Sequence, residues 1–211
     1  MNEKNKSKKG RTFLKIFATV AGSILVIAMI NITPTLIDRS RYPKDSPEYY
    51  YKSRQLAVSS FINSYFSYRE EGAFLPCIID VADKNGEIAR SQAEVAIKKR
   101  GRYRFTTRSS SSIMSSKHVS VCKVFYDNIT GTYCAIIGFY DRNKSNDFYY
   151  EDSSGNMFSR LDGKDPKFSI FYHVYDKTPH GLDLYEKSEI DPSYERKIGA
   201  VKVERSKVRD Y

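Results

Sequence analysis

VSVCKVFYDNITGTYCAIIGFY, residues 119–140, has the pattern of two apolar strands joined by a short polar turn. Residues 119–126 and 132–140 are rich in β-branched and aromatic side chains, which favour strands. The turn, residues 127–131, contains Asp, Asn and Gly, which are residue types that reverse a chain easily. The sequence therefore predicts a β-hairpin here, and antiparallel strands as the main component of the chain after residue 72.

A second hairpin is expected upstream of the first. Residues 74–82 are apolar and β-branched, and they are followed by Asn85-Gly86, a pair favoured in tight turns in which both central residues have positive φ. The return segment, residues 87–100, alternates apolar and polar side chains, which favours a strand. Its Ala, Glu and Lys content also suits a helix, so both interpretations stay open there.

Downstream segments extend the strand-rich pattern. Residues 157–161, 167–175 and 199–208 are expected to form strands, because each contains several β-branched or aromatic residues. Residues 106–117 (TTRSSSSIMSSK) contain little that could be buried, and they are expected to form a serine-rich loop.

One helix is expected before these strands. Ser46 can cap a helix, Pro47 fits its first turn, and Glu48 lies close to the positive end of the helix dipole. Apolar residues then recur at steps of three and four residues: Tyr51, Val58, Phe61, Ile62, Tyr65 and Phe66. We expect a helix over about 47–71. The fold class is then α+β, with one helix packed on a curved, mainly antiparallel sheet in a single domain, residues 46–211.

The first 45 residues are typical of a membrane anchor. Residues 1–15 form a basic tail, and residues 16–37 (IFATVAGSILVIAMINITPTLI) carry no charge, which as a helix gives about 33 Å against the ~30 Å core of a bilayer. The basic flank favours a cytoplasmic tail, with residues 46–211 exported behind a polar linker, residues 38–45. We expect a single-pass protein of the inner (cytoplasmic) membrane, with its C-terminal domain in the periplasm or outside. A cleaved signal or a buried helix remains an alternative.

The amino-acid composition and the absence of certain motifs exclude several classes of protein. The chain has 211 residues, with 35 Lys and Arg against 25 Asp and Glu, and it contains 17 Tyr, 12 Phe and no Trp. This composition excludes collagen, a coiled coil, a multi-pass membrane protein and a wholly disordered chain. The sequence contains no nucleotide-binding loop, zinc-ligand spacing or nucleophile elbow. We therefore expect no enzymatic activity, no cofactor and no metal.

The chain has three cysteines, and two of them lie in the central hairpin. If the turn at 127–131 is a five-residue loop, Cys122 faces Ile136 and Cys134 faces Val124, which makes the two sulfurs diagonal neighbours on one face. A disulfide between Cys122 and Cys134 is therefore a candidate in an oxidising compartment. Pairing of Cys77 with one of them, or three buried thiols, remains open.

The strongest surface signal is a basic segment at 98–108. It interleaves two aromatic residues with six cations: Lys98, Lys99, Arg100, Arg102, Arg104 and Arg108. This pattern suits an acidic partner protein, an anionic lipid surface or a nucleic acid, of which nucleic acid is the least expected partner for an exported domain. A solvated edge strand whose charges prevent aggregation would carry the same pattern.

Residues 59–71 (SSFINSYFSYREE) also carry a family resemblance. A basic tail, one membrane helix, a linker and a helix ending in aromatic-x-x-Arg-Glu resemble the inner-membrane bridging subunits of bacterial type IV secretion and conjugation machines, and Tyr65, Tyr68, Arg69 and Glu70 carry the likeness. The resemblance implies a nuclear-transport-factor-2-like exported domain, with helices cupped in a curved antiparallel sheet. The chain departs from that family by its shorter helical part before the strands and by the missing Asn-Pro-containing motif near the C-terminus.

Together these features favour an assembly or interaction module of a cell-envelope complex, with a secretion or conjugation machine as the setting that the resemblance implies. Its partners would be other subunits of that complex or further copies of itself. The alternative is an extracytoplasmic ligand-binding or sensory domain with a pocket lined by Tyr and Phe.

Overall fold

The computed structural model describes residues 19–23, 29, 33–106, 109–112, 119–140, 147–201 and 203. Within them, a helical segment at 33–40 precedes helix α2 (Pro47–Ala57) and the 3-10 turn η1 (Ser59–Phe61). Most of the remaining described residues lie in strands, which form three antiparallel sheets.

The strands fill the three sheets largely in chain order. The exception is β8, which belongs to the third sheet although β9 and β10, which follow it in the chain, belong to the second. Sheet A has the order β1 (Ser64–Tyr68), β2 (Phe74–Ala82), β3 (Ile88–Lys98) and β4 (Tyr103–Phe105). Sheet B has the order β5 (Ser109–Ser112), β6 (Val119–Asp127), β7 (Thr132–Tyr140), β10 (Phe168–Tyr175) and β9 (Ser159–Asp162). Sheet C has the order β12 (Glu195–Val201), β11 (Leu182–Ser188) and β8 (Phe148–Asp152).

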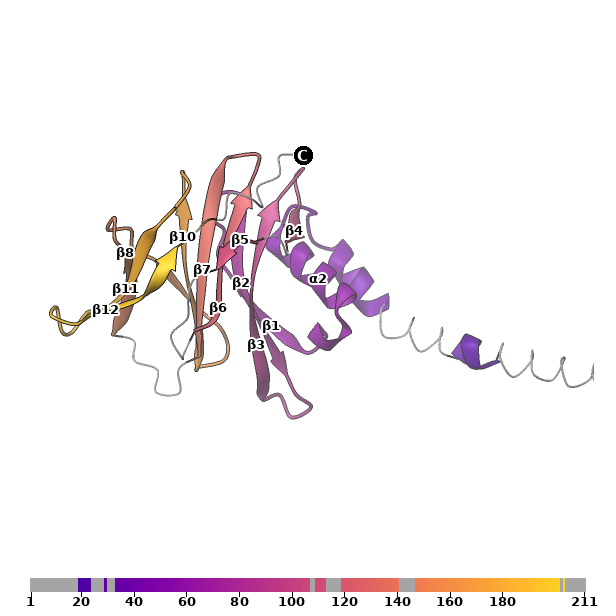
Figure 1. Cartoon of the computed structure of the whole chain (residues 1–211). Helices are drawn as coiled ribbons and strands as arrows, with labels where there is room; N and C mark the ends of the chain where they lie inside the picture. The colour runs from indigo at the N-terminus through magenta and orange to yellow at the C-terminus, as the bar shows by residue number, and fades with distance from the viewer. Residues whose placement is uncertain are drawn as a thin grey trace, which may run out of the picture.

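The three sheets stack as layers, and α2 covers the outer face of sheet A (Figure 1). One core joins sheets A and B and includes Ile78 of β2 and Ile136 of β7. A second core joins sheets B and C and includes Ile137 of β7 and Leu184 of β11. Sheet B is therefore covered on both faces, which explains why the middle of β7 is an uninterrupted apolar run.

Helix α2 begins where the sequence predicts it. The Ser46 hydroxyl accepts a hydrogen bond from the Tyr49 backbone N–H (3.1 Å), and Pro47 occupies the first turn. The helix ends at Ala57, however, and residues 64–68 form β1, so the expected helix over 47–71 is wrong in its second half.

The aromatic spacing that suggested the longer helix has another origin. Alternate side chains of a strand share a face, so Phe66 and Tyr68 lie on one face of β1 and Tyr65 lies on the other. Phe66 stacks on Tyr51 of α2 with ring centroids 4.6 Å apart and lies 5.0 Å from the partly exposed ring of Tyr68, whereas Tyr65 is exposed. The pairing of β1 with β2 therefore determines the structure of this segment.

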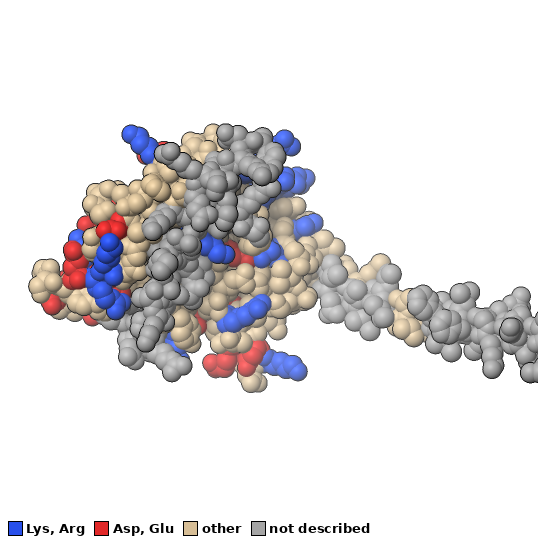
Figure 2. Space-filling model, in the orientation of Figure 1, with Lys and Arg blue, Asp and Glu red and all other residues tan. Residues whose placement is uncertain are grey.

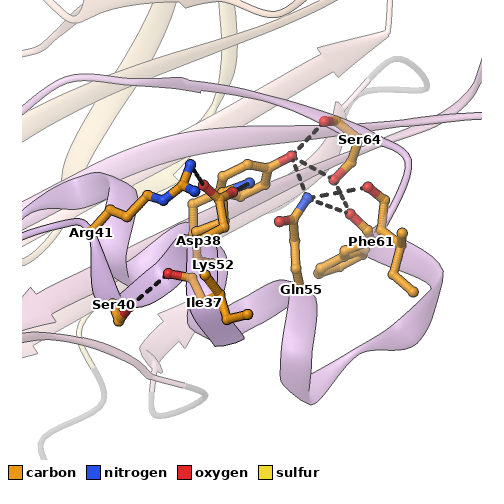
Figure 3. Close-up of polar contacts among 10 residues, drawn as sticks. Ile37, Asp38, Ser40, Arg41, Lys52, Gln55, Phe61 and Ser64 are labelled. Carbon is orange, nitrogen blue, oxygen red and sulfur yellow. Dashed lines mark hydrogen bonds and ion pairs between the residues drawn. The ribbon is translucent and has the colours of Figure 1, made fainter. Parts of the chain in front are cut away.

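Polar contacts hold α2 to the segments on either side of it (Figure 3). Lys52 forms an ion pair of 2.6 Å with Asp38 of the helical segment 33–40. The buried Gln55 amide donates hydrogen bonds to the carbonyl oxygens of Phe61 and Ile62, at 3.0 and 3.3 Å. These bonds satisfy backbone acceptors beneath the helix and fix the direction in which the chain leaves α2 for β1.

The expected fold class is wrong. A single curved sheet covered by one helix, and helices cupped in such a sheet as the family resemblance implies, are both replaced by three stacked antiparallel sheets in the described part of the chain. Tyr65 and Tyr68 lie on β1, and Arg69 and Glu70 lie just after it, so the residues that carry the resemblance are not on a helix.

The expected membrane anchor at 16–37, and the single-pass inner-membrane location that depends on it, are also contradicted. None of the helices formed by the described residues combines the length and the apolar character needed to cross a bilayer. The described residues 33–40 are helical, and the charged Asp38 and Arg39 lie among them. Residues 16–18, 24–28 and 30–32 of the expected anchor lie outside the described residues, as does the basic tail at 1–15.

Several strand predictions are confirmed. β2, β6, β7 and β10 match the expected segments closely, and the ambiguous return segment 87–100 is mainly strand β3. The expected strands at 157–161 and 199–208 are shifted to β9 and β12. β8 and β11 were not predicted, and β5 lies inside the expected serine-rich loop, of which residues 107–108 and 113–117 are outside the described part.

Candidate functional site

The basic segment forms a hairpin between β3 and β4, which we call the basic hairpin (residues 98–105). Lys99 and Arg102 exchange two backbone hydrogen bonds, Lys99 N–H to Arg102 O at 2.8 Å and the reverse at 3.2 Å. The two central residues, Arg100 and Gly101, have φ of 52° and 68°. This is a two-residue turn of the I′ kind, whose twist matches that of the flanking strands.

Arg100 is an unusual residue for this position. It is the one non-glycine residue with positive φ in the described part of the chain. Left-handed backbone costs an L-residue roughly 1 kcal/mol, and Asn or Gly normally occupies the place. The chain thus holds an exposed guanidinium group at the tip of the hairpin at some expense in stability.

The structure brings together five of the six predicted cations, and Arg108 lies outside the described residues. The Lys98 ammonium lies 5.2 Å from the centre of the Tyr103 ring. The Lys99 ammonium donates to the Asn128 side-chain oxygen at 3.2 Å, which ties the hairpin to the β6–β7 turn. Arg100, like Arg102 and Arg104, is exposed to solvent.

None of the five cations forms an ion pair with a described carboxylate. Cations in sheet C differ: Lys187 lies 3.0 Å from Glu151, and Lys197 lies 2.6 Å from Asp183. In Figure 2, Lys and Arg side chains gather at the upper right, over the part of sheet A that carries β3 and β4 in Figure 1. The five described cations of the basic hairpin are therefore not neutralised by direct ion pairs with described carboxylates.

A buried polar network connects the basic hairpin and the adjoining part of β3 to α2. Arg54 donates from Nε and Nη2 to the Glu94 carboxylate at 3.0 and 2.6 Å, and the Tyr50 hydroxyl donates to the same carboxylate at 2.7 Å. The Arg54 guanidinium also lies over the ring of Phe105, 4.0 Å from its centre. Tyr103 is buried in the cluster beneath α2. The backbone of β4 is thus held by contacts on its inner face.

Burial and the Glu94 carboxylate act in opposite directions on Arg54. Burial, the largest single influence, lowers the pKa of Arg54, but the hydrogen bonds and the charge of Glu94, with smaller contributions from Tyr50 and Cys77, together raise it above its usual value. Burial, with a smaller contribution from Glu70, raises the pKa of Tyr103 to about 12. Arg54 therefore stays charged and Tyr103 stays neutral throughout the physiological pH range.

The expected disulfide does not match the register of the central hairpin. The loop between Asp127 and Thr132 has four residues, so Cys134 pairs with Phe125 and Cys122 pairs with Ile137. Cross-strand partners share a face, and positions three residues apart on a strand face opposite ways, so the two cysteine positions lie on opposite faces of sheet B. Cys134 is a free, buried thiol, and so is Cys77.

Sequence reasoning missed one unusual buried group. Asp80 of β2 is fully buried, and its Oδ2 accepts the backbone N–H groups of Lys164 and Asp165. Its Oδ1 has no hydrogen-bond partner. A side chain at Gly163 would come within 2.6 Å of Asp80 Oδ2, so only glycine allows this approach. Asp80 therefore clasps the β9–β10 connection to sheet A, and only its place in an apolar strand could have signalled this.

The aromatic ligand pocket that the alternative function requires gains little support. A cavity of about 80 Å³ lies between β3 and β6, lined among others by Glu94, Phe105 and Phe125. It has room for a few water molecules. A hollow of about 400 Å³ beside β1 and the β2–β3 turn is open to solvent, and it is lined mainly by small or polar residues around Ile62 and Tyr65. Neither is an enclosed pocket of Tyr and Phe.

Among the described residues, no group of three or more His, Cys, Asp or Glu side chains lies together in a way that could hold a metal ion. No protein-family model, curated protein or solved structure matches the chain. The basic hairpin is therefore the feature on which a functional argument can be built.

Proposed function

We propose that the chain is a non-catalytic interaction module that docks an acidic surface of a partner protein on its basic hairpin. The observation that carries this proposal is that five cations on one short hairpin lack ion pairs with described carboxylates. Single exposed cations without an ion pair to a described carboxylate also occur elsewhere, at Lys84, Lys167 and Lys177, so the distinguishing feature of the hairpin is that five cations without such a pair lie together. The strained Arg100 supports the same conclusion, because a residue that lowers stability at a turn is best explained by a contact made there.

Such a surface is expected to affect mainly the rate at which the partner associates and the choice of partner. An exposed ion pair contributes about 0.2–1 kcal/mol, so five of them give a modest affinity that salt weakens strongly. A concentrated positive field also raises the association rate of an acidic partner. Assembly of a multi-subunit complex uses these properties. That the complex is a secretion or conjugation apparatus stays a prediction.

The test compares two triple variants of the full chain that lose the same net charge. The hairpin variant carries Arg100→Asn, Arg102→Gln and Arg104→Thr, and the control variant carries Gln at three exposed lysines elsewhere: Lys84, Lys167 and Lys177. The probes are a glutamate-rich peptide, anionic lipid vesicles and a single-stranded oligonucleotide. We expect peptide affinity to fall at least tenfold in the hairpin variant and less than threefold in the control. Equal losses in both variants, or tighter binding of vesicles or oligonucleotide through the hairpin, would refute the proposal.

A further inference from the structure

Strand β4 lies at an edge of sheet A. It pairs with β3 on one side, and no strand among the described residues pairs with it on the other. The pairing covers only three residue pairs, ending at Ala96 and Phe105. An edge of this kind presents backbone groups that an additional strand can pair with.

The register identifies which backbone groups face outward. Lys99 and Arg102 exchange both of their backbone hydrogen bonds, so pairs along this antiparallel ladder alternate from that point. Arg104, which pairs with Ile97, therefore turns its N–H and C=O toward β3. Tyr103 and Phe105 turn theirs away from β3. Consistent with this alternation, the Lys98 N–H donates across to Ala73 O at 2.7 Å rather than to β4.

The side chains along this edge alternate in chemistry. Arg102 and Arg104 are exposed cations, whereas Tyr103 is buried under α2 and the Phe105 ring is 42 % exposed. A strand laid beside β4 would bring every second side chain next to the arginines and the others next to Phe105. The matching sequence is an alternation of acidic and apolar residues.

A second copy of the same strand does not fit this edge. Pairing β4 with β4 of another molecule would place arginines from both copies side by side, and like charges on neighbouring strands repel. The same arginines attract carboxylates. Charge complementarity therefore selects an acidic strand over self-association.

We propose that the open edge of β4 is a strand-addition site for an extended acidic segment of the partner protein. This inference rests on the proposed function and specifies how the partner binds. Main-chain hydrogen bonds to Tyr103 and Phe105 supply the pairing, and Arg102 and Arg104 select acidic side chains at alternate positions. The contact with Phe105 favours an apolar residue between them.

The experiment uses the full chain with isotope labelling and two peptides. The first is acetyl-Glu-Val-Glu-Thr-Glu-Val-Glu-amide, and the second has the same sequence with N-methyl groups on the Val and Thr nitrogens. N-methylation keeps the charge but removes the hydrogens and the space that strand pairing needs. We expect the N-methylated peptide to bind at least tenfold more weakly.

Amide hydrogen exchange locates the contact. With the first peptide bound, the Tyr103 and Phe105 amides should exchange at least tenfold more slowly, while the Arg104 amide, which already faces β3, should not change. If both peptides bind equally and the two amides are unaffected, strand addition is refuted while electrostatic docking stands. If neither peptide binds, both the strand-addition site and the proposed function fail.

Discussion

Replacing Glu94 with alanine should destabilise the protein by about 3–5 kcal/mol, because it leaves a mostly buried cation without its partner. The Glu94 side chain is 1 % exposed and that of Arg54 is 13 % exposed. The substitution removes acceptors for two hydrogen bonds from Arg54, one from Tyr50 and one from Gln92. Glu94→Gln keeps the volume and some of the bonds, so its expected cost is smaller, about 1.5–3 kcal/mol.

Urea unfolding followed by far-ultraviolet circular dichroism measures the effect. With a slope near 3 kcal/mol per molar, as expected for a chain of this size, the midpoint should fall by about 1–2 M in Glu94→Ala. The matched control is Glu195→Ala, which removes a carboxylate 3.5 Å from Lys187 on an exposed strand and should cost under about 1 kcal/mol.

A double variant separates the loss of the pair from the loss of its packing. Arg54→Met with Glu94→Leu replaces the ion pair by apolar side chains, and its stability should lie within about 2 kcal/mol of the original chain. The reasoning is refuted if Glu94→Ala costs under about 1 kcal/mol, or if the double variant is as unstable as the sum of the two single variants.

Three further predictions concern the turn at Arg100 and Gly101, the contact between Asp80 and the β9–β10 connection, and the stability of the protein at alkaline pH. Arg100→Asn should stabilise the protein by about 0.5–1 kcal/mol, because Asn tolerates positive φ, and an unchanged or lower urea midpoint would contradict the strain argument. Gly163→Ala should cost about 1–3 kcal/mol, because its Cβ would lie 2.6 Å from Asp80 Oδ2, and thermal unfolding that matches the original chain would contradict it. Burial raises the pKa of Tyr103 and of Tyr172 to about 12, so the unfolded chain loses these protons first, from about pH 10. Stability should therefore be complete below about pH 10 and fall as pH rises toward 12. Phe at both sites should make that fall shallower in urea titrations across this range, and tyrosines such as Tyr68, whose pKa is also raised to about 12, should account for the remainder.

The residue types at the turns made the hairpins predictable from the sequence. The arrangement of the strands in three stacked sheets could not be predicted in this way. The strands on either side of residues 127–131 follow from apolar runs around Asp and Gly, and the same reasoning found β2 and β3. The division into three sheets depends on which face of each strand meets which neighbour. Cys134 and Ala135 are adjacent in sequence and belong to different cores, which no local pattern distinguishes.

Buried carboxylates concealed the two strands of sheet C that sequence reasoning missed. Asp152 of β8 and Glu186 of β11 interrupt the apolar pattern, yet both are buried. Tyrosine hydroxyls satisfy them: Tyr175 donates to Asp152 at 2.7 Å, and Tyr150 donates to Glu186 at 2.9 Å. The high tyrosine content therefore supplies polar partners for core acids as well as apolar bulk.

The residues of the candidate site could be predicted from the sequence, but the geometry of its turn could not. The sequence showed the basic segment and the possibility of an edge strand, and five of the six cations lie on or beside the edge strand β4. The two-residue turn was missed because Arg100 stands where Asn is usual. The cysteine geometry was off by one residue because the β6–β7 loop has four residues rather than five, and a shift of one residue reverses every face.

The chain enters the outermost sheet with β8, returns to the middle sheet for β9 and β10, and leaves again to complete the outer sheet with β11 and β12. These two layers are consequently interlaced, and neither can detach while the other stays folded. Loss of the C-terminal strands would expose the Tyr- and Phe-rich side of the middle layer, including Phe139 and Phe171, to water. Folding of this part is thus expected to be all-or-none, and these two layers of a nascent chain become stable only after β12 has emerged from the ribosome.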